Sequence, residues 1–144
     1  MKNVEIVKLR VIEEGFYTNG KEIYVHNFNE RWIKLVVADD IKKGNYCIGV
    51  IVDGVFNVCY IGRSTEQTLQ QRICQHLSED DDHFFDDHYY FFFEAAETDD
   101  DAYNQKCIDY HSFGGDDDYL DNDYHPSLSK GMHCPWKGCN HVGS

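Results

Sequence analysis

Alternating apolar and polar positions predict strands in the first third of the chain. Residues 2–12 and 22–28 alternate in this way, and the Asn-Gly pair at 19–20 between them is typical of a hairpin turn because both residues tolerate positive φ. The composition of Arg31–Val37 favours a third strand. We therefore expect residues 1–43 to form a small N-terminal β extension.

A hairpin followed by a helix is expected next. Asn45–Val52 and Phe56–Ile61 are rich in apolar residues and flank a turn at Asp53-Gly54. Residues 65–77 have the apolar period of a helix, and Thr65 is the expected N-cap. The predicted apolar stripe of this helix consists of Leu69, Ile73 and Leu77.

The pattern then repeats as an aromatic strand and a second helix. Tyr89–Ala96 predicts a strand, and a helix over about 101–112 is expected after an N-cap at Thr98 or Asp99. The sequence therefore predicts an α/β fold, with a small, mostly antiparallel central sheet flanked by helices and preceded by the β extension. The expected central domain spans 44–126, and 127–144 is an irregular Cys/His-containing tail.

Length and composition limit the class of protein. At 144 residues the chain corresponds to about one domain, and 42% hydrophobic residues suffice for a core. No apolar run approaches the ~18 residues of a membrane span, and no secretion signal is recognised, so we expect a cytoplasmic protein without a membrane partner. The six cysteines are then expected to be reduced.

Charge is distributed unevenly. The net charge is −13, yet residues 1–76 carry 10 Lys/Arg against 9 Asp/Glu, so the acidic excess lies in residues 77–144. A nucleic-acid binder usually has a basic footprint, which here must be local. The acidic runs at 80–82, 99–101 and 116–118 leave a rival hypothesis, an inhibitor that imitates DNA phosphates, beside the simpler interpretation of a solvated surface.

One motif carries chemistry suited to a phosphodiester. Tyr60-Ile61-Gly62 ends a predicted strand just before a predicted helix, and Arg72 and His76 lie four residues apart on one helical face. Tyr or His can move a proton, and the guanidinium fork of Arg can hold phosphate oxygens. The combination predicts a site that binds or cuts a phosphodiester.

With these residues the chain resembles the GIY-YIG nuclease superfamily over about residues 45–126. The first triad of that family would fall on Gly49-Val50-Ile51 and the second on Tyr60-Ile61-Gly62, with L-x-x-R-x-x-x-H following at 69–76. Further matches are the helix AYNQKCIDYH at 102–111, Asn122 and His125-Pro126.

The resemblance implies an endonuclease that hydrolyses double-stranded DNA with Mg²⁺. It assigns proton transfer or water positioning to Tyr60, the phosphate to Arg72, and support of the base or leaving group to His76, and it makes Asn122 a residue that lines the site. Gly62 would leave room for substrate, with Arg63 and Ser64 beside it as substrate-binding residues. A site-specific nuclease of this size would also need the β extension, the tail, a homodimer or another protein partner.

Two positions depart from the family pattern. The first triad ends in Ile51 rather than Tyr, although Tyr46 is near in sequence, and Lys106 stands where the family has its metal-binding glutamate. An ammonium group repels Mg²⁺ instead of binding it. We therefore expect the chain as written to be inactive or crippled as a nuclease, with a non-catalytic DNA- or protein-binding module as the alternative.

Three explanations for Lys106 stay open. It is an inactivating change acquired during cloning, since Glu and Lys codons differ by one base and an active nuclease harms its host. It is natural, and the protein binds without cutting. Or a neighbouring carboxylate from Glu94, Glu97 or Asp109 replaces the missing ligand.

The tail offers ligands for a second metal. Cys134 and Cys139 have a spacing that zinc sites use, and His141 follows closely. These three residues would leave one position of a structural Zn²⁺ site to be filled. The candidates for it are His125, His133 and Cys107, with His125 preferred. The alternative is a flexible tail with free thiols.

Overall fold

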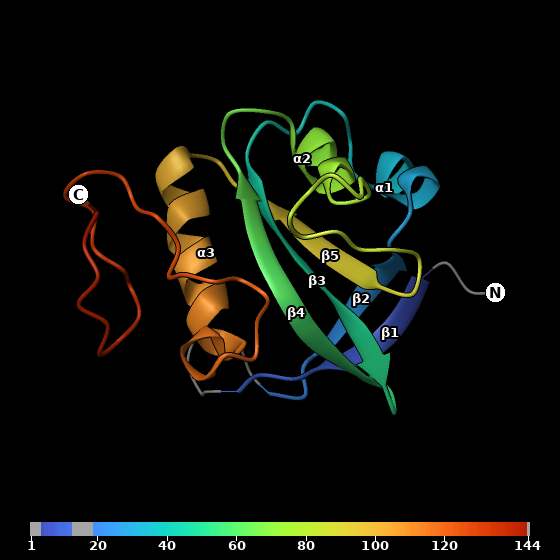
Figure 1. Cartoon of the computed structure of the whole chain (residues 1–144), viewed down its shortest axis with the longest axis horizontal. Coiled ribbons are helices and arrows are strands. Elements are labelled where there is room, and N and C mark those ends of the chain that lie inside the picture. The colour runs from blue at the N-terminus through green and yellow to red at the C-terminus, as the bar shows by residue number, and fades with distance from the viewer. Residues whose placement is uncertain (1–3, 13–18, 144) are drawn as a thin grey trace.

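A computed structural model of the protein describes residues 4–12 and 19–143, and its strands form one closed sheet in the order β1-β2-β5-β3-β4 (Figure 1). The strands are β1 (Val4–Leu9), β2 (Glu22–Asn27), β3 (Gly44–Val52), β4 (Val55–Ser64) and β5 (Tyr90–Ala95). Neighbouring strands are antiparallel except β1 and β4, which pair in parallel at Lys8↔Val55 and Leu9↔Phe56. The expected α/β class is therefore present, but a mostly antiparallel central sheet only loosely describes this closed, mixed sheet.

The segment expected as an N-terminal β extension supplies two strands of the same sheet. β2 pairs with β5 at His26↔Phe91, and β1 closes the sheet onto β4. Alternation explains why both segments are strands, because Val7, Leu9 and Val25 point into the core while their neighbours face outward. The predicted strand over 2–12 and the predicted turn at Thr18-Asn19-Gly20-Lys21 lie partly outside the described residues.

The predicted strand over Arg31–Val37 is wrong, because this segment forms helix α1 (Glu30–Val36). The side chain of Asn29 accepts a hydrogen bond from the backbone N–H of Trp32 at 2.9 Å and so caps the helix. One turn of helix also pairs Lys34 with Glu30 at 2.7 Å and buries Ile33 completely.

The two other helices lie near their predicted positions. α2 (Leu69–Gln75) begins after Thr68 rather than Thr65, because the Thr68 hydroxyl and the Gln71 side chain form a reciprocal capping box. α3 (Asp99–Ser112) is capped by Thr98, as expected. In the part of the chain that the structure describes, no helix is long and apolar enough to cross a membrane.

Alternate side chains of β3 belong to two different apolar clusters. Tyr46 and Ile48 pack with α1 and α2 on one face, whereas Cys47 packs on the other face with α3 residues such as Tyr110. The C-terminal tail lies along the side of α3 that faces away from the sheet, where Leu128 and Trp136 cover Cys107 and its neighbours (Figure 1). α3 is thus packed between the sheet and the tail.

Candidate functional site

A buried hydrogen bond joins β3 to the end of α2. The Tyr46 hydroxyl lies 2.7 Å from Nε2 of His76, and Nδ1 of His76 lies 2.8 Å from the backbone carbonyl of His83. Because a carbonyl oxygen only accepts, Nδ1 carries the proton and Nε2 accepts from the Tyr46 hydroxyl. The Tyr60 ring packs edge-on against His76, with ring centroids 4.9 Å apart. The structure thus brings Tyr60 and His76 together and adds Tyr46.

Burial keeps all three of these groups neutral. It lowers the pKa of His76 to about 4, with a further contribution from the positive charge of Arg72. Burial also raises the pKa of Tyr46 far above its ordinary value and raises that of Tyr60. His76 has no exposed surface. Its imidazole therefore acts as a neutral acceptor that orients Tyr46.

Two arginines line a polar cleft of about 210 Å³ next to this group. Arg63 lies over the Tyr103 ring with 3.9 Å between guanidinium carbon and centroid, and its Nη1 donates to Thr65 at 3.0 Å. Its buried Nε has no hydrogen-bond partner among residues 4–12 and 19–143. Arg72 donates to Gln75 at 3.0 Å. Both guanidinium groups line the cleft and can receive an anion there.

Lys106 adds a third cation to the cluster. Its side chain is half-buried on α3, and burial together with the charges of Arg63 and Arg72 lowers its pKa to about 8. Two acidic residues are nearby: Glu66 also lines the cleft, and the Asp81 carboxylate lies 4.0 Å from Nη1 of Arg72. The site is therefore positively charged locally, in a chain whose net charge is −13.

Gly62 makes room for the Tyr46 ring, whereas the resemblance implied that it makes room for substrate, which stays a prediction. The two residues are cross-strand partners, and a Cβ at Gly62 would lie 2.1 Å from Cζ of the Tyr46 ring. The close approach of the phenol to the strand is possible only with glycine at this position.

Two other predicted site residues are used within the fold. Asn122 forms a reciprocal pair with the backbone of Ile61, in which its Oδ1 accepts and its Nδ2 donates, each at 2.9 Å. The buried Ser64 hydroxyl donates to the Gln67 carbonyl and so holds the loop before α2. These interactions give both residues a positioning role in β4 and the segments that flank it.

Tyr46 was missed as a site residue because the first triad was assigned to Gly49-Val50-Ile51. Ile51 pairs with Phe56 near the hairpin turn, at the opposite end of β3 from Tyr46, and a register shift lies at Gly49. The signal in the sequence that could have found Tyr46 is Gly44, two residues before it. The structure shows why glycine is needed there, because a Cβ at Gly44 would lie 2.6 Å from the Glu94 carbonyl oxygen.

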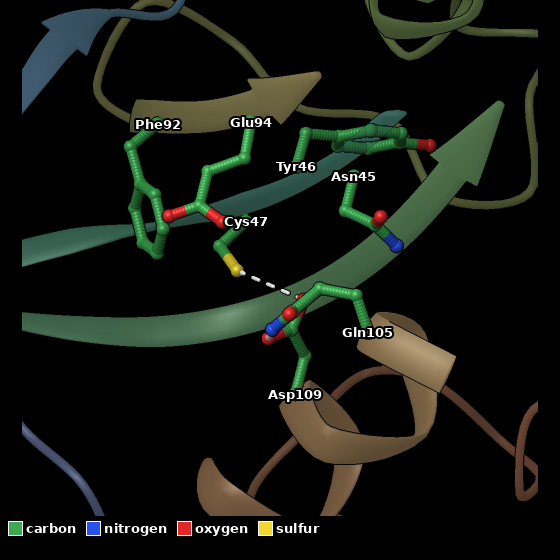
Figure 2. Close-up of a pocket in the computed structure, with 7 residues that line it drawn as sticks. All are labelled: Asn45, Tyr46, Cys47, Phe92, Glu94, Gln105 and Asp109. Atoms are coloured by element: carbon green, nitrogen blue, oxygen red, sulfur yellow. Dashed lines mark hydrogen bonds between the residues drawn. The ribbon is translucent and has the colours of Figure 1, made fainter. Parts of the chain in front are cut away.

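Two of the three carboxylates considered as replacements for a metal-binding glutamate gather around Cys47, and one of them, Asp109, is near enough to Lys106 to act on its pKa. Asp109 and Glu94 line a small pocket around Cys47, while the Tyr46 ring points away from it (Figure 2). Asp109 accepts hydrogen bonds from Gln105 at 2.9 Å and from the Cys47 thiol at 3.9 Å. Burial and these carboxylates raise the pKa of Cys47 well above its usual value. Because Cys47 and Tyr46 are adjacent in β3, they face opposite sides of the sheet.

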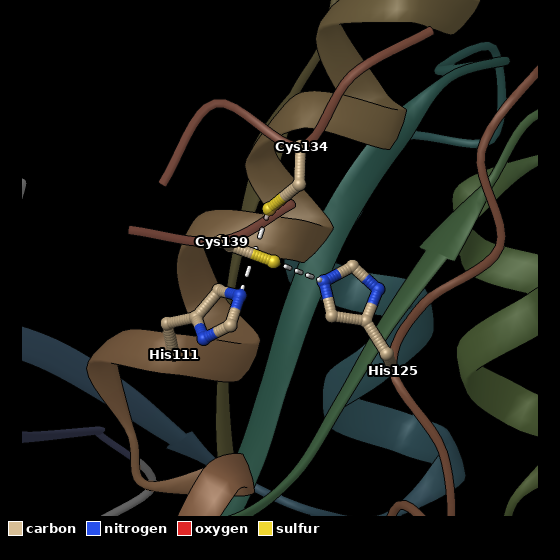
Figure 3. A group of neighbouring side chains, drawn as sticks. All are labelled: His111, His125, Cys134 and Cys139. Atoms are coloured by element: carbon tan, nitrogen blue, oxygen red, sulfur yellow. Dashed lines mark hydrogen bonds between the residues drawn. The ribbon is translucent and has the colours of Figure 1, made fainter. Parts of the chain in front are cut away.

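A second group of polar side chains gathers where the tail meets α3. One ligand atom from each of His111, His125, Cys134 and Cys139 lies within 4.8 Å of all the others. Figure 3 shows both imidazoles and both thiols converging. Three of these residues were predicted as zinc ligands, with His111 here instead of His141. The His141 ring stacks on His125 with centroids 4.0 Å apart. Spacing alone could not reveal His111, because α3 brings it to the tail from 23 residues away.

Comparison of the chain with protein-family models, curated proteins and solved structures found no match in any of the three.

Proposed function

We propose that the protein binds the phosphodiester backbone of double-stranded DNA at the cleft beside Arg63 and Arg72, as a GIY-YIG-type nuclease domain that does not cut in its present sequence. The observation that carries the proposal is the gathering of these two arginines with Lys106, and Arg72 is close enough to Tyr60 to act on its pKa. Guanidinium forks match phosphate oxygens, and an ammonium group adds a point charge. A bound phosphate would offset the mutual repulsion of the three cations.

Tyr46 supports the resemblance more strongly than the sequence did. The phenol that seemed to be missing from the first triad lies beside Tyr60, with ring centroids 6.5 Å apart, and Gly44 precedes it by two residues. Gly44-Asn45-Tyr46 is therefore the better candidate for the first triad.

The residues present do not fit Mg²⁺ at the cation cluster. Magnesium takes oxygen ligands, whereas Lys106 contributes an ammonium group that repels it. Asp109 is hydrogen-bonded to Gln105 and Cys47. Neither Asp109 nor Glu94 belongs to a group of His, Cys, Asp and Glu side chains with metal-site spacing in the described ranges. Binding without cutting is thus the function that the site supports best.

Binding is tested with a labelled DNA duplex at increasing salt. The affinity should fall steeply between about 50 mM and about 200 mM salt, and Arg72→Ala should reduce the slope of log affinity against log salt by about 1. Arg31→Ala, which removes an exposed arginine of α1 outside the cleft, is the matched control. No binding at any salt concentration would overturn the proposal and favour the inhibitor that imitates DNA.

The pH dependence of binding tests the part played by Lys106. Because its pKa in the free protein is about 8, affinity should decline as the pH rises above that value and the ammonium loses its proton. Lys106→Arg should retain binding and remove this decline, because arginine stays charged. If the affinity of Lys106→Arg for DNA still declines with pH as in the unaltered chain, Lys106 does not contact the phosphate.

Cutting is tested on plasmid DNA with Mg²⁺ or Mn²⁺. The chain as written should leave the plasmid intact, and Lys106→Glu should restore a metal ligand and with it cleavage. Arg72→Ala added to Lys106→Glu should abolish that cleavage. Cutting by the unaltered chain would show that another carboxylate holds the metal, and the proposal of binding without cutting would fail.

A further inference from the structure

We propose that His111, His125, Cys134 and Cys139 bind one structural zinc ion that fastens the C-terminal tail to α3. This inference does not depend on the proposed DNA binding, since the four residues lie outside the cleft of Arg63 and Arg72. The residue types are those of a Cys₂His₂ site, and borderline-soft Zn²⁺ prefers nitrogen and thiolate ligands.

The spacing between the ligand atoms suits a tetrahedral ion. Cys134 Sγ lies 3.5 Å from His111 Nε2, and Cys139 Sγ lies 3.5 Å from His125 Nε2. Zinc–sulfur bonds of about 2.3 Å and zinc–nitrogen bonds of about 2.05 Å at a tetrahedral angle place sulfur and nitrogen about 3.5 Å apart. The two pairs come from three separate segments of the chain and converge on one point (Figure 3).

Both imidazoles are oriented by a hydrogen bond at the other ring nitrogen. Nδ1 of His111 lies 2.6 Å from a carboxylate oxygen of Asp116, and Nδ1 of His125 lies 2.9 Å from the Pro126 carbonyl. Each acceptor holds the proton on Nδ1, so that the lone pair of Nε2 faces the thiols. Metal-binding histidines in proteins commonly have this second partner, which fixes the tautomer and raises ligand basicity.

The surroundings favour a structural ion over a catalytic one. Four protein ligands complete a tetrahedron and leave no position for a water molecule. Cys134 and His111 are buried, and Trp136 stacks on the His111 ring with centroids 5.3 Å apart. The tail forms isolated bridges such as His133↔Val142 and a small apolar cluster with α3, in which Leu128 and Trp136 pack near Cys107. An ion at this place would add a further restraint that holds the tail to α3.

Zinc would also support the edge of β4. His125 follows Asn122 by three residues, and Asn122 pairs with the Ile61 backbone inside the Tyr60-Ile61-Gly62 strand. Fixing His125 to α3 therefore restrains the segment that completes β4. The metal would be a structural clamp located away from the cleft.

The experiment measures metal content of the full chain purified under reducing conditions without chelator. Elemental analysis by mass spectrometry should find one zinc per chain. Replacement of zinc by Co²⁺ should give the strong visible absorption bands of a tetrahedral site and a thiolate-to-cobalt charge-transfer band. His111→Gln and Cys139→Ser should each lose most of the zinc. The matched controls His141→Gln and Cys59→Ser should keep it.

Two measurements guard against variants that fail to fold. The Co²⁺ titration uses the unaltered chain, and circular dichroism accompanies every variant. Absence of metal from the unaltered chain after supplementation with Zn²⁺ would overturn the proposal, as would a disulfide between Cys134 and Cys139 in the reduced preparation. Loss of zinc in His141→Gln with retention in His111→Gln would also refute the ligand set.

Discussion

Lowering the pH should destabilise the protein through His76 by an amount that the structure allows us to work out. Its pKa is about 4 in the folded protein and 6.5 in its ordinary state. Above both values the imidazole is neutral in either state, and the full stability is present. As the pH falls below 6.5, His76 takes up a proton in the unfolded chain but stays neutral in the folded protein. Stability is therefore lost until the pH reaches about 4.

The size of the effect follows from the linkage relation. One unit of pKa difference corresponds to about 1.4 kcal/mol, so the whole loss attributed to His76 is about 3 kcal/mol, of which about 2 kcal/mol has occurred by pH 5. The ring has no exposed surface, so solvent screening reduces this value little. Other titrating groups also contribute to acid destabilisation, and a comparison of variants must remove their share.

Urea unfolding between about pH 7.5 and pH 5 measures the effect. His76→Gln lacks the titrating group, so its free energy of unfolding should fall by about 2 kcal/mol less than that of the unaltered chain over this range. His88→Gln is the matched control, because the His88 side chain is 84% exposed. If His76→Gln and the unaltered chain lose equal stability, the buried neutral imidazole bonded to Tyr46 is refuted.

Three further predictions concern the fold around the cleft. Gly62→Ala should lower the free energy of unfolding in urea by about 2 kcal/mol, because its Cβ would overlap the Tyr46 ring. The double variant with Tyr46→Ala should lose less than the sum of the two single losses, and additive losses would contradict the clash. Thr68→Ala should cost about 1 kcal/mol by loss of the capping box, and Thr65→Ala should cost less in the same assay; the reverse order would restore the cap expected from sequence. Asn122→Ala should lower the free energy of unfolding by about 2 kcal/mol, because it leaves two backbone groups of β4 unpaired. DNA affinity per folded molecule should stay unchanged. A selective loss of affinity would place Asn122 in the phosphate site.

Local patterns determined most of the elements. Alternation predicted β1 and β2, and apolar or aromatic composition predicted β3 to β5. The apolar period predicted α2 and a polar N-cap predicted α3, because these signals arise within one turn or one strand. The same reasoning failed at α1. Its seven residues resemble a strand by composition, and the helix depends on the Asn29 cap and on burial of Ile33.

The candidate site was only partly readable from the sequence for the same reason. Tyr60, Arg72 and His76 lie close enough in sequence for strand and helix periods to bring them together. Tyr46 could not be placed, because it is 30 residues away from His76 and their contact depends on the register of β3 against β4. A shift of one residue in that register would turn the phenol to the opposite face of the sheet.

The sequence by itself determined the α/β class, the positions of the strands and of most helices along the chain, the local basic residues in an acidic chain, and a tail rich in His and Cys. Tertiary structure decided the closure of the sheet through β1 and β4, the partnership of Tyr46 with His76, and the gathering of His111 with His125, Cys134 and Cys139. The physical reason is that period and capping are properties of neighbouring residues. Closure, register and the meeting of α3 with the tail depend on how distant apolar surfaces pack.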